Sequence, residues 1–292
     1  MRGNALEHQL VAPGSLNAVL DLIASAPGQW TPIAGGTELM VAFAAGRLSA
    51  GKLVSLWDIK EIRFIKTNPE SLTIGAGTTF SDLRSNPIVA TEFPLLDEAA
   101  SWIGAIANQT RATVGGNLVN GSPAADSSPA LLVYDAEVEL ISIHGKRRLP
   151  YSQFHTGYKQ NAMTADELMF AVHLPRRFSG HRHYIRKVGT RRAMAISKVA
   201  LAAAARMNGQ RIDEIRVAAA SLAPFPARLV DTETVLAGKV FDTVLIESAR
   251  QALLAEVQPI DDIRSTAEYR KQVGANLLRE FLLSLQSEPA IK

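Results

Sequence analysis

Residues 113–132 read "TVGGNLVNGSPAADSSPALL", a passage of small and polar residues that turns apolar at its end. It contains three glycines and two prolines, and it closes on Ala130, Leu131 and Leu132. Long connections without regular structure are uncommon in compact domains and usually serve a function. The passage therefore indicates main chain that lies against a ligand, followed by a helix anchored in the core.

The size and composition of the chain are those of an ordinary globular protein. It has 292 residues, 47% hydrophobic and 20% charged, enough for one large or two modest domains. The formal net charge is only +3, which gives no argument for binding nucleic acid. The densest basic stretch, residues 176–192, holds seven Lys and Arg residues and reads either as a solvated hairpin or as a surface for a partner or a phosphate.

The chain contains no cysteine, which excludes several kinds of site. Disulfides, catalytic thiols, zinc–thiolate sites and cysteine-ligated iron–sulfur clusters all need that side chain. No apolar run approaches the ~20 residues needed to span a bilayer, and the N-terminus lacks the basic and apolar regions of a signal peptide. The expected location is cytoplasmic, with no membrane span.

The first half of the sequence alternates between helix and strand patterns. Apolar residues at helical spacing predict a helix over 15–26 with Ser15 as its N-cap, and a second over 38–45 capped by Thr37. Further helices are expected at 80–84 and 95–103, and strands at 30–34, 53–56, 72–75, 137–143 and 167–174.

Beyond Pro175 the pattern changes to strands followed by helices. Strands are predicted at 184–188, 199–207 and 215–220, with Asn208-Gly209 as a hairpin turn, and helices at 241–257 and 267–285. This order predicts a separate, smaller α+β domain with a three-stranded antiparallel sheet. We expect two domains, residues 1–177 and 178–292.

Two double-glycine turns have the composition of a ligand cradle. They are Ile33-Ala34-Gly35-Gly36-Thr37 and Thr113-Val114-Gly115-Gly116-Asn117. Paired glycines let the main chain approach a ligand closely, and successive N–H groups can converge on an anion. Two such turns would suit the two phosphates of a dinucleotide, although a Gly-Gly pair by itself is most often an ordinary tight turn.

Familiar catalytic motifs do not occur in the sequence. The Rossmann glycine spacing is absent from both turns and the P-loop is absent from the chain. There is no nucleophile elbow and no His-Glu-x-x-His helix. His181 and His183 lack a third ligand candidate nearby, and Asp126 reads either as a helix cap or as a contact to a ligand. A cofactor is therefore expected to supply the chemistry.

Four segments, in order and at matching spacing, carry a family resemblance: "IAGGTELM" at 33–40, "ATVGGNLVNGSPAADSSPALL" at 112–132, "FHTGYKQNAMTADELMFAVHLP" at 154–175 and "ISKVALAAAARM" at 196–207. They resemble the FAD-binding (medium) subunit of the xanthine dehydrogenase and molybdenum hydroxylase family over nearly the whole chain. The resemblance implies an α+β fold, with a two-part FAD-binding domain of the vanillyl-alcohol oxidase (PCMH) type followed by the smaller C-terminal domain.

The resemblance also assigns residues to FAD. Main-chain donors to the diphosphate would come from the first turn and its continuation, namely Ile33, Ala34, Gly35, Gly36, Thr37, Glu38 and Leu39. A second wall near the diphosphate and ribityl chain would be formed by Thr113, Gly115, Gly116 and Asn117. Ser122 and Asp126 would contact the ribityl or flavin side, and Leu168 or Met169 would pack by the isoalloxazine or adenine ring. Lys198 would approach the flavin, where a cation stabilises negative charge on the reduced ring.

Two departures from the family pattern stand out. The family often has Gln-Ile-Arg-Asn before its second motif, whereas this chain has Ala107-Asn108-Gln109-Thr110, with Arg111 two residues beyond the expected arginine. Some relatives also hold an iron–sulfur cluster in this subunit, which a chain without cysteine cannot do in the usual way. The FAD is expected to be non-covalent, because neither turn contains His or Cys.

The family resemblance implies an electron-transfer oxidoreductase subunit that is incomplete alone. Molybdopterin would lie on a large partner subunit and two [2Fe-2S] clusters on a small one, completing a heterotrimer, and electrons would pass through FAD to NAD⁺. One alternative is the FAD subunit of an aldehyde, nicotinate or carbon monoxide dehydrogenase with another acceptor. A stand-alone flavin oxidoreductase of the same fold and a scaffold that has lost its flavin are the others. The resemblance implies that the substrate is bound by the molybdenum subunit.

Overall fold

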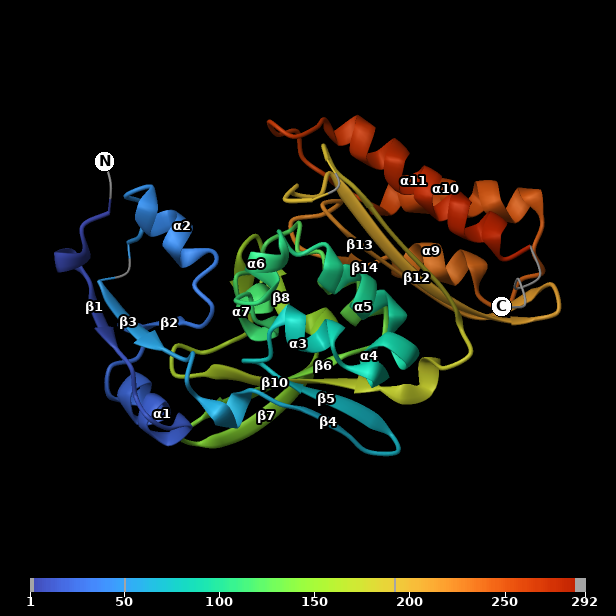
Figure 1. Cartoon of the computed structure of the whole chain (residues 1–292). Coiled ribbons are helices and arrows are strands. Elements are labelled where there is room, and N and C mark those ends of the chain that lie inside the picture. The colour runs from blue at the N-terminus through green and yellow to red at the C-terminus, as the bar shows by residue number, and fades with distance from the viewer. Residues whose placement is uncertain (1–2, 50, 192, 287–292) are drawn as a thin grey trace.

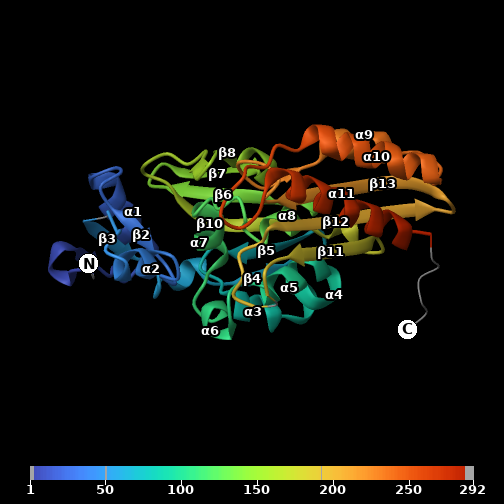
Figure 2. The ribbon, with the colours of Figure 1, turned by 90° about the horizontal axis from the view of Figure 1, so that it is seen from above.

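The computed structural model describes residues 3–49, 51–191 and 193–286. Three parts follow one another along the chain: a small N-terminal unit, a central unit built on a five-stranded sheet, and a C-terminal unit built on a four-stranded sheet (Figure 1). From above they form a row, with the N-terminal unit at one end (Figure 2). The predicted α+β architecture is confirmed.

The N-terminal unit is a parallel sheet with the strand order β1-β3-β2. Its elements are η1 (Ala5–Glu7), β1 (Gln9–Val11), α1 (Leu16–Ser25), β2 (Thr31–Ile33), α2 (Leu39–Ala44) and β3 (Lys52–Ser55). Helix α1 begins as predicted, because the Ser15 hydroxyl accepts from the Ala18 N–H at 3.3 Å. The predicted Thr37 cap is wrong: Glu38 is the N-cap residue of α2, and no described side chain caps that helix.

The central unit is an antiparallel sheet with the strand order β4-β5-β10-β6-β7. Its strands are β4 (Ile65–Thr67), β5 (Ser71–Gly75), β6 (Glu137–Ser142), β7 (Gly145–Pro150) and β10 (Leu168–Pro175), beside the small hairpin β8 (His155–Gly157) and β9 (Gln160–Asn161). Its helices are η2 (Lys60–Ile62), α3 (Phe80–Arg84), α4 (Pro87–Glu92), α5 (Pro94–Ser101), α6 (Ile106–Gln109), α7 (Val114–Val119), α8 (Ser128–Val133) and η3 (Tyr151–Gln153).

The C-terminal unit has four strands, so the prediction of three is wrong. They are β11 (Arg182–Val188), β12 (Val199–Asn208), β13 (Arg211–Ala220) and β14 (Ala227–Arg228), with η4 (Arg176–Phe178) before them and α9 (Val230–Leu236), α10 (Thr243–Glu256) and α11 (Ala267–Ser284) after them. Strand β14 has only two residues, too few to show a periodicity. Strand β13 starts four residues before the predicted 215 because it pairs with β12 as far as Asn208↔Arg211.

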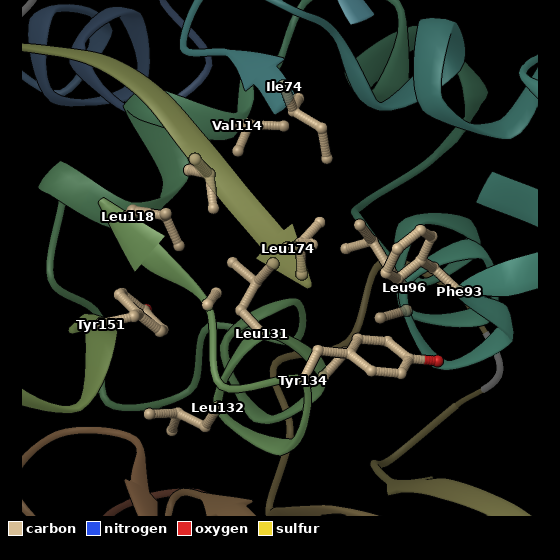
Figure 3. Close-up of a cluster of buried hydrophobic side chains, with 14 of the residues drawn as sticks. Ile74, Phe93, Leu96, Val114, Leu118, Leu131, Leu132, Tyr134, Tyr151 and Leu174 are labelled. Atoms are coloured by element: carbon tan, nitrogen blue, oxygen red, sulfur yellow. The ribbon is translucent and has the colours of Figure 1, made fainter. Parts of the chain in front are cut away.

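Helix α8, the end of the opening passage, lies between the two large sheets. Every residue from Ser128 to Val133 is buried, and Leu131 and Tyr134 point into the cluster of apolar side chains over the central sheet (Figure 3). Strand β12 meets it with small residues: Ala202 and Ala204 belong to that cluster, while Leu201 on the opposite face belongs to the cluster under α11. Small side chains let a helix approach a sheet closely, so the alanines of β12 explain how α8 fits.

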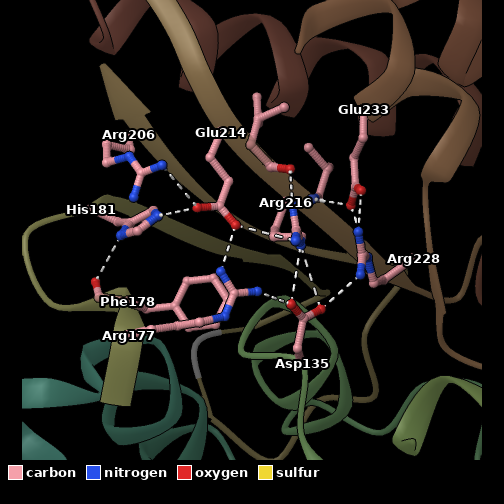
Figure 4. A network of polar contacts seen from close by, with 11 residues as sticks. Asp135, Arg177, Phe178, His181, Arg206, Glu214, Arg216, Arg228 and Glu233 are labelled. Atoms are coloured by element: carbon pink, nitrogen blue, oxygen red, sulfur yellow. Dashed lines mark hydrogen bonds and ion pairs between the residues drawn. The ribbon is translucent and has the colours of Figure 1, made fainter. Parts of the chain in front are cut away.

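A network of ion pairs joins the central and C-terminal units (Figure 4). Asp135, which follows α8, has φ +48° and receives hydrogen bonds from Arg177, from Arg216 at 3.3 Å and from Arg228 at 2.7 Å. Glu214 of β13 also binds Arg177, at 2.6 Å. Arg177, from the basic stretch 176–192, thus pairs with an acid of each unit and is not part of a free charged surface.

Replacing Asp135 by Asn tests this network. Asn tolerates a positive φ, so the substitution removes the charge while keeping the backbone, and three arginines lose their shared carboxylate. We expect the free energy of unfolding to fall by about 1–3 kcal/mol, measured by urea denaturation. Glu247→Gln, which removes an exposed partner of Arg250, is the control and should change little. Equal stability of Asp135→Asn and wild type would contradict the assigned role.

His183 gives the fold an acid-sensitive point. Its ring lies edge-on to Tyr134 at 5.8 Å between centroids, and its Nε2 is buried with no hydrogen-bond partner among the described residues. Burial, with a smaller contribution from His181, lowers the pKa of His183 to about 4. The native state therefore holds His183 neutral at a pH where the unfolded chain has already bound a proton.

Stability should accordingly depend on pH. Well above pH 6.5, His183 does not make the free energy of unfolding depend on pH. As the pH falls from 6.5 toward 4, the unfolded state binds the proton first, and the free energy of unfolding decreases by up to about 2 kcal/mol by pH 5. Urea denaturation at pH 7.5 and 5.0 measures this loss. His183→Phe should reduce the loss but not abolish it, because burial also lowers the pKa of His155 and His173. If His183→Phe lost as much stability between pH 7.5 and 5.0 as wild type does, the role assigned to His183 would be contradicted.

Candidate cofactor site

The first glycine turn presents a row of unused main-chain donors. The N–H groups of residues 34–39 donate to no acceptor within the described part of the chain. The turn is held at its start, where the Ile33 carbonyl accepts from the Leu56 N–H at 2.8 Å, and at its end, where the Gly36 carbonyl accepts from the Met40 N–H at 2.9 Å. Gly36 has φ +73°. Successive free amides in such a turn suit an anion.

The two glycine turns are neighbours in space. A Cβ added to Gly35 would lie 1.7 Å from the Arg111 carbonyl oxygen, closer than any real contact. Arg111 is two residues before Thr113, where the second turn begins. The N-terminal unit can therefore approach the central unit this closely only because residue 35 has no side chain.

The second turn differs from the first, since its donors are already used. Thr113 is the N-cap of α7, and its hydroxyl accepts from the Gly116 N–H at 3.1 Å. The Gly115 N–H donates to the Ala76 carbonyl at 2.8 Å, and the Asn117 N–H donates to the Thr113 carbonyl at 3.0 Å. Gly115 is required by packing, because a Cβ there would lie 2.7 Å from the Ala76 Cβ. These residues can form a wall, but the amides of Gly115, Gly116 and Asn117 are engaged inside the protein.

A cavity of about 770 Å³ adjoins the first turn. It is lined by the turn, by α2 and by the end of α6 and the residues after it: Gly35, Gly36, Thr37, Met40, Val41, Ala44, Ala45, Ala107, Asn108 and Arg111. Helix α2 buries none of its residues. The apolar helix α2 thus forms one side of an open cavity, and the first glycine turn with its free N–H groups forms another.

Asp126 neither caps α8 nor faces open solvent. Its carboxylate receives hydrogen bonds from the Lys187 ammonium at 2.5 Å and from the Ser197 hydroxyl, both in the C-terminal unit. Burial raises the pKa of Asp126, and Lys187 and Ser197 oppose that rise. Lys187 was missed by the sequence reasoning, since its only signal there was membership of the basic stretch 176–192.

The remaining predicted residues are spread over the core and the domain junction. The Ser122 hydroxyl accepts from the Ala124 N–H at 3.2 Å, inside its own loop. Leu168 and Met169 are 3% and 4% exposed, in two different core clusters. The Lys198 ammonium lies 5.2 Å from the centre of the Tyr269 ring of α11. The lysine that contacts Asp126 is Lys187, and the roles assigned to these four residues at FAD stay predictions.

The departure from the family pattern before the second turn also has a structural account. Gln109, which stands where the family has arginine, is 3% exposed; it accepts from Arg84 at 2.8 Å and donates to the Ser101 carbonyl at 2.9 Å. The Arg111 guanidinium lies 3.7 Å from the centre of the Trp57 ring. Position 109 thus serves local packing, and the nearby arginine is held by an aromatic face.

A second cavity, of about 540 Å³, lies on the outer face of the central sheet. Its polar lining is largely paired: Glu139 binds Lys146 at 2.9 Å, Arg148 at 3.0 Å and His173 at 2.6 Å. It contains neither glycine turn. No group of three His, Asp or Glu side chains suited to a metal occurs in the described residues.

Comparison with known proteins gives the family. Residues 6–177 match the model of the FAD binding domain in molybdopterin dehydrogenase, and residues 184–285 match that of the CO dehydrogenase flavoprotein C-terminal domain. This chain belongs to the FAD-binding subunits of the molybdenum hydroxylase family. It is therefore an oxidoreductase subunit whose cofactor is FAD.

Similar proteins support the family along nearly the whole chain. A putative xanthine dehydrogenase FAD-binding subunit of Escherichia coli (strain K12) is 32% identical over 260 residues, 88% of each chain. The carbon monoxide dehydrogenase medium chain of Hydrogenophaga pseudoflava is 27% identical over 271 residues, 93% of this chain and 94% of the relative. The solved structure of that organism's carbon monoxide dehydrogenase superposes with a TM-score of 0.91 and 26% identity over 96% of both chains.

Among the helices of the described residues, none combines the length and the apolar character that a membrane span requires.

Gly35→Ala tests the contact between the two turns. The added methyl group must displace either the first turn or the Arg111 carbonyl, so we expect a loss of about 1–3 kcal/mol in stability and faster hydrogen exchange in residues 3–56. Gly14→Ala is the control, since a Cβ there meets nothing within 4 Å. Unchanged exchange in the N-terminal unit of Gly35→Ala would show that the close approach is not needed.

Proposed function

We propose that this chain is the FAD-binding electron-transfer subunit of a xanthine dehydrogenase-like molybdenum hydroxylase. It would act with a large molybdopterin-binding subunit and a small [2Fe-2S] subunit, and would pass electrons from their clusters to NAD⁺. The predicted cytoplasmic location is part of the same proposal. The observation that carries it is the run of free amides at residues 34–39, inside a chain that matches the family from residue 6 to residue 285.

The chemical groups at the first turn and in the adjoining cavity suit the diphosphate and the ring systems of FAD. Free main-chain N–H groups bind phosphate oxygens without adding a charge of their own, and the adjoining cavity of about 770 Å³ has the apolar wall expected of a cofactor site. Bound FAD supplies the one- and two-electron redox chemistry that the side chains of this subunit lack. The chain's own part is to bind the diphosphate, to line the cofactor space with α2, and to hold the Asp126–Lys187 pair at the junction with the C-terminal unit.

The choice of acceptor and partner chemistry rests on relatives. The resemblance at 154–175 is our ground for NAD⁺ as the acceptor, and the relative at 32% identity, a xanthine dehydrogenase subunit by name, supports the xanthine dehydrogenase branch. The carbon monoxide dehydrogenase relative, 27% identical over 93% of this chain, favours the alternative, a different substrate and a different acceptor. Reoxidation of the reduced, purified complex by NAD⁺ or only by another acceptor distinguishes the two.

FAD binding by the full chain is the direct test. We expect stoichiometric, non-covalent binding, measured by quenching of flavin fluorescence, and no purine oxidation in the absence of partners. Gly36→Val should weaken FAD binding at least about tenfold, because a branched side chain at positive φ distorts the amide row.

Gly238→Val is a matched control for backbone strain. Gly238 has φ +74°, close to the +73° of Gly36, but lies in the C-terminal unit with nothing within 4 Å of an added Cβ. Its substitution should cost similar stability and leave FAD binding unchanged. A wild-type chain that refuses FAD, or that oxidises xanthine alone, would overturn the proposal.

A further inference from the structure

The tip of the β8–β9 hairpin brings a cation to the first glycine turn. The tip residues are Tyr158 and Lys159, between His155–Gly157 and Gln160–Asn161. The Lys159 ammonium lies 4.0 Å from the Glu38 carboxylate, and the two side chains are 47% and 63% exposed. Glu38 is one of the residues whose N–H has no acceptor in the described structure.

The main chain of the hairpin tip is fixed against the passage 113–132. Lys159 has φ +53° and Gly121, just after α7, has φ +61°. A Cβ on Gly121 would lie 3.1 Å from the Lys159 Cα, so only glycine permits this approach without displacement. The Asn161 amide donates to the Val119 carbonyl at 3.4 Å, which ties the hairpin to α7 a second time. Lys159 therefore reaches the first turn from a hairpin whose main chain is packed on the passage 113–132.

The contact with Glu38 does not account for this placement. An exposed pair at 4.0 Å is beyond hydrogen-bond distance, and such surface pairs add little to stability. The nearby Arg111 is stacked on Trp57 at 3.7 Å. Amide donors carry no net charge, whereas a diphosphate is strongly anionic, and a cation beside neutral donors adds a charge-assisted contact.

We propose that Lys159 binds the diphosphate of FAD, as the charged partner of the free amides at residues 34–39. The inference rests on the proposed function, since it assumes that the diphosphate lies at the first turn. Lys159 exchanges its weak contact with Glu38 for the phosphate oxygens when the cofactor binds. The β8–β9 hairpin is then a third element of the site, besides the two glycine turns.

The test compares three probes on the full chain. FAD contains both diphosphate and flavin, ADP has the diphosphate without the flavin, and riboflavin has the flavin without phosphate. Lys159→Gln should weaken binding of FAD and of ADP by about tenfold each and leave riboflavin binding unchanged. Lys159→Arg, which keeps the charge, should stay within about threefold of wild type. The affinity of wild type for ADP should fall more steeply with salt than that of Lys159→Gln.

Lys66→Gln is the control for loss of a surface lysine. Its ammonium lies 5.0 Å from the centre of the Phe64 ring, in the lining of the cavity on the outer face of the central sheet. It should bind all three probes as wild type does. Equal FAD and ADP binding by Lys159→Gln and wild type would overturn the inference while the proposed function stands, and so would an equal loss of riboflavin binding, which would indicate a structural role. Failure of the wild-type chain to bind FAD would instead remove the proposed function, and this inference with it.

Discussion

The burial of helix α8 between two sheets is the constraint on which the rest of the structure depends. All six of its residues are buried, so its sequence must be apolar or small, and the sheet that meets it must be smooth. The alanines of β12 and β13, Ala202, Ala204 and Ala218, meet that requirement. A carboxylate lies near each end of α8: Asp126 before it and Asp135 after it, and both bind cations of the C-terminal unit. Both carboxylates therefore fix the orientation of one unit on the other.

The two Gly-Gly pairs have different roles in the structure. In the second, Thr113 caps a helix and the amides are taken up by Ala76 and by Thr113 itself. In the first, the place of Thr113 is taken by Ile33, which has no side-chain oxygen; Thr37, after the glycines, caps nothing, and the amides remain open. A capping side chain and an external anion compete for the same donors. The missing cap at α2 is thus the feature that separates a ligand turn from a structural one.

The sequence predicted most of the regular structure and, within the candidate site, the first glycine turn but not Lys187. Elements with their own signal were found: α1 with its Ser15 cap, α3 at 80–84, and the long strand β12. Elements made by pairing alone, such as β14, left no pattern. The first turn was identified from Gly35 and Gly36, since glycine requirements are local. Lys187 was not, because its contact with Asp126 joins residues 61 positions apart, and spacing cannot show which of two lysines reaches a distant carboxylate.

The alanine face of the C-terminal sheet has a consequence for how the chain can be divided. That sheet is covered by its own helices on one side only; the other side is covered by α8, which comes from the preceding region of the sequence. An excised segment from residue 178 onward would expose a continuous stripe of small apolar residues to water, with nothing of its own to cover it. We therefore expect the two regions matched by separate family models to fold as one cooperative unit. The C-terminal segment can be exchanged between relatives only together with the helix that fills its open face.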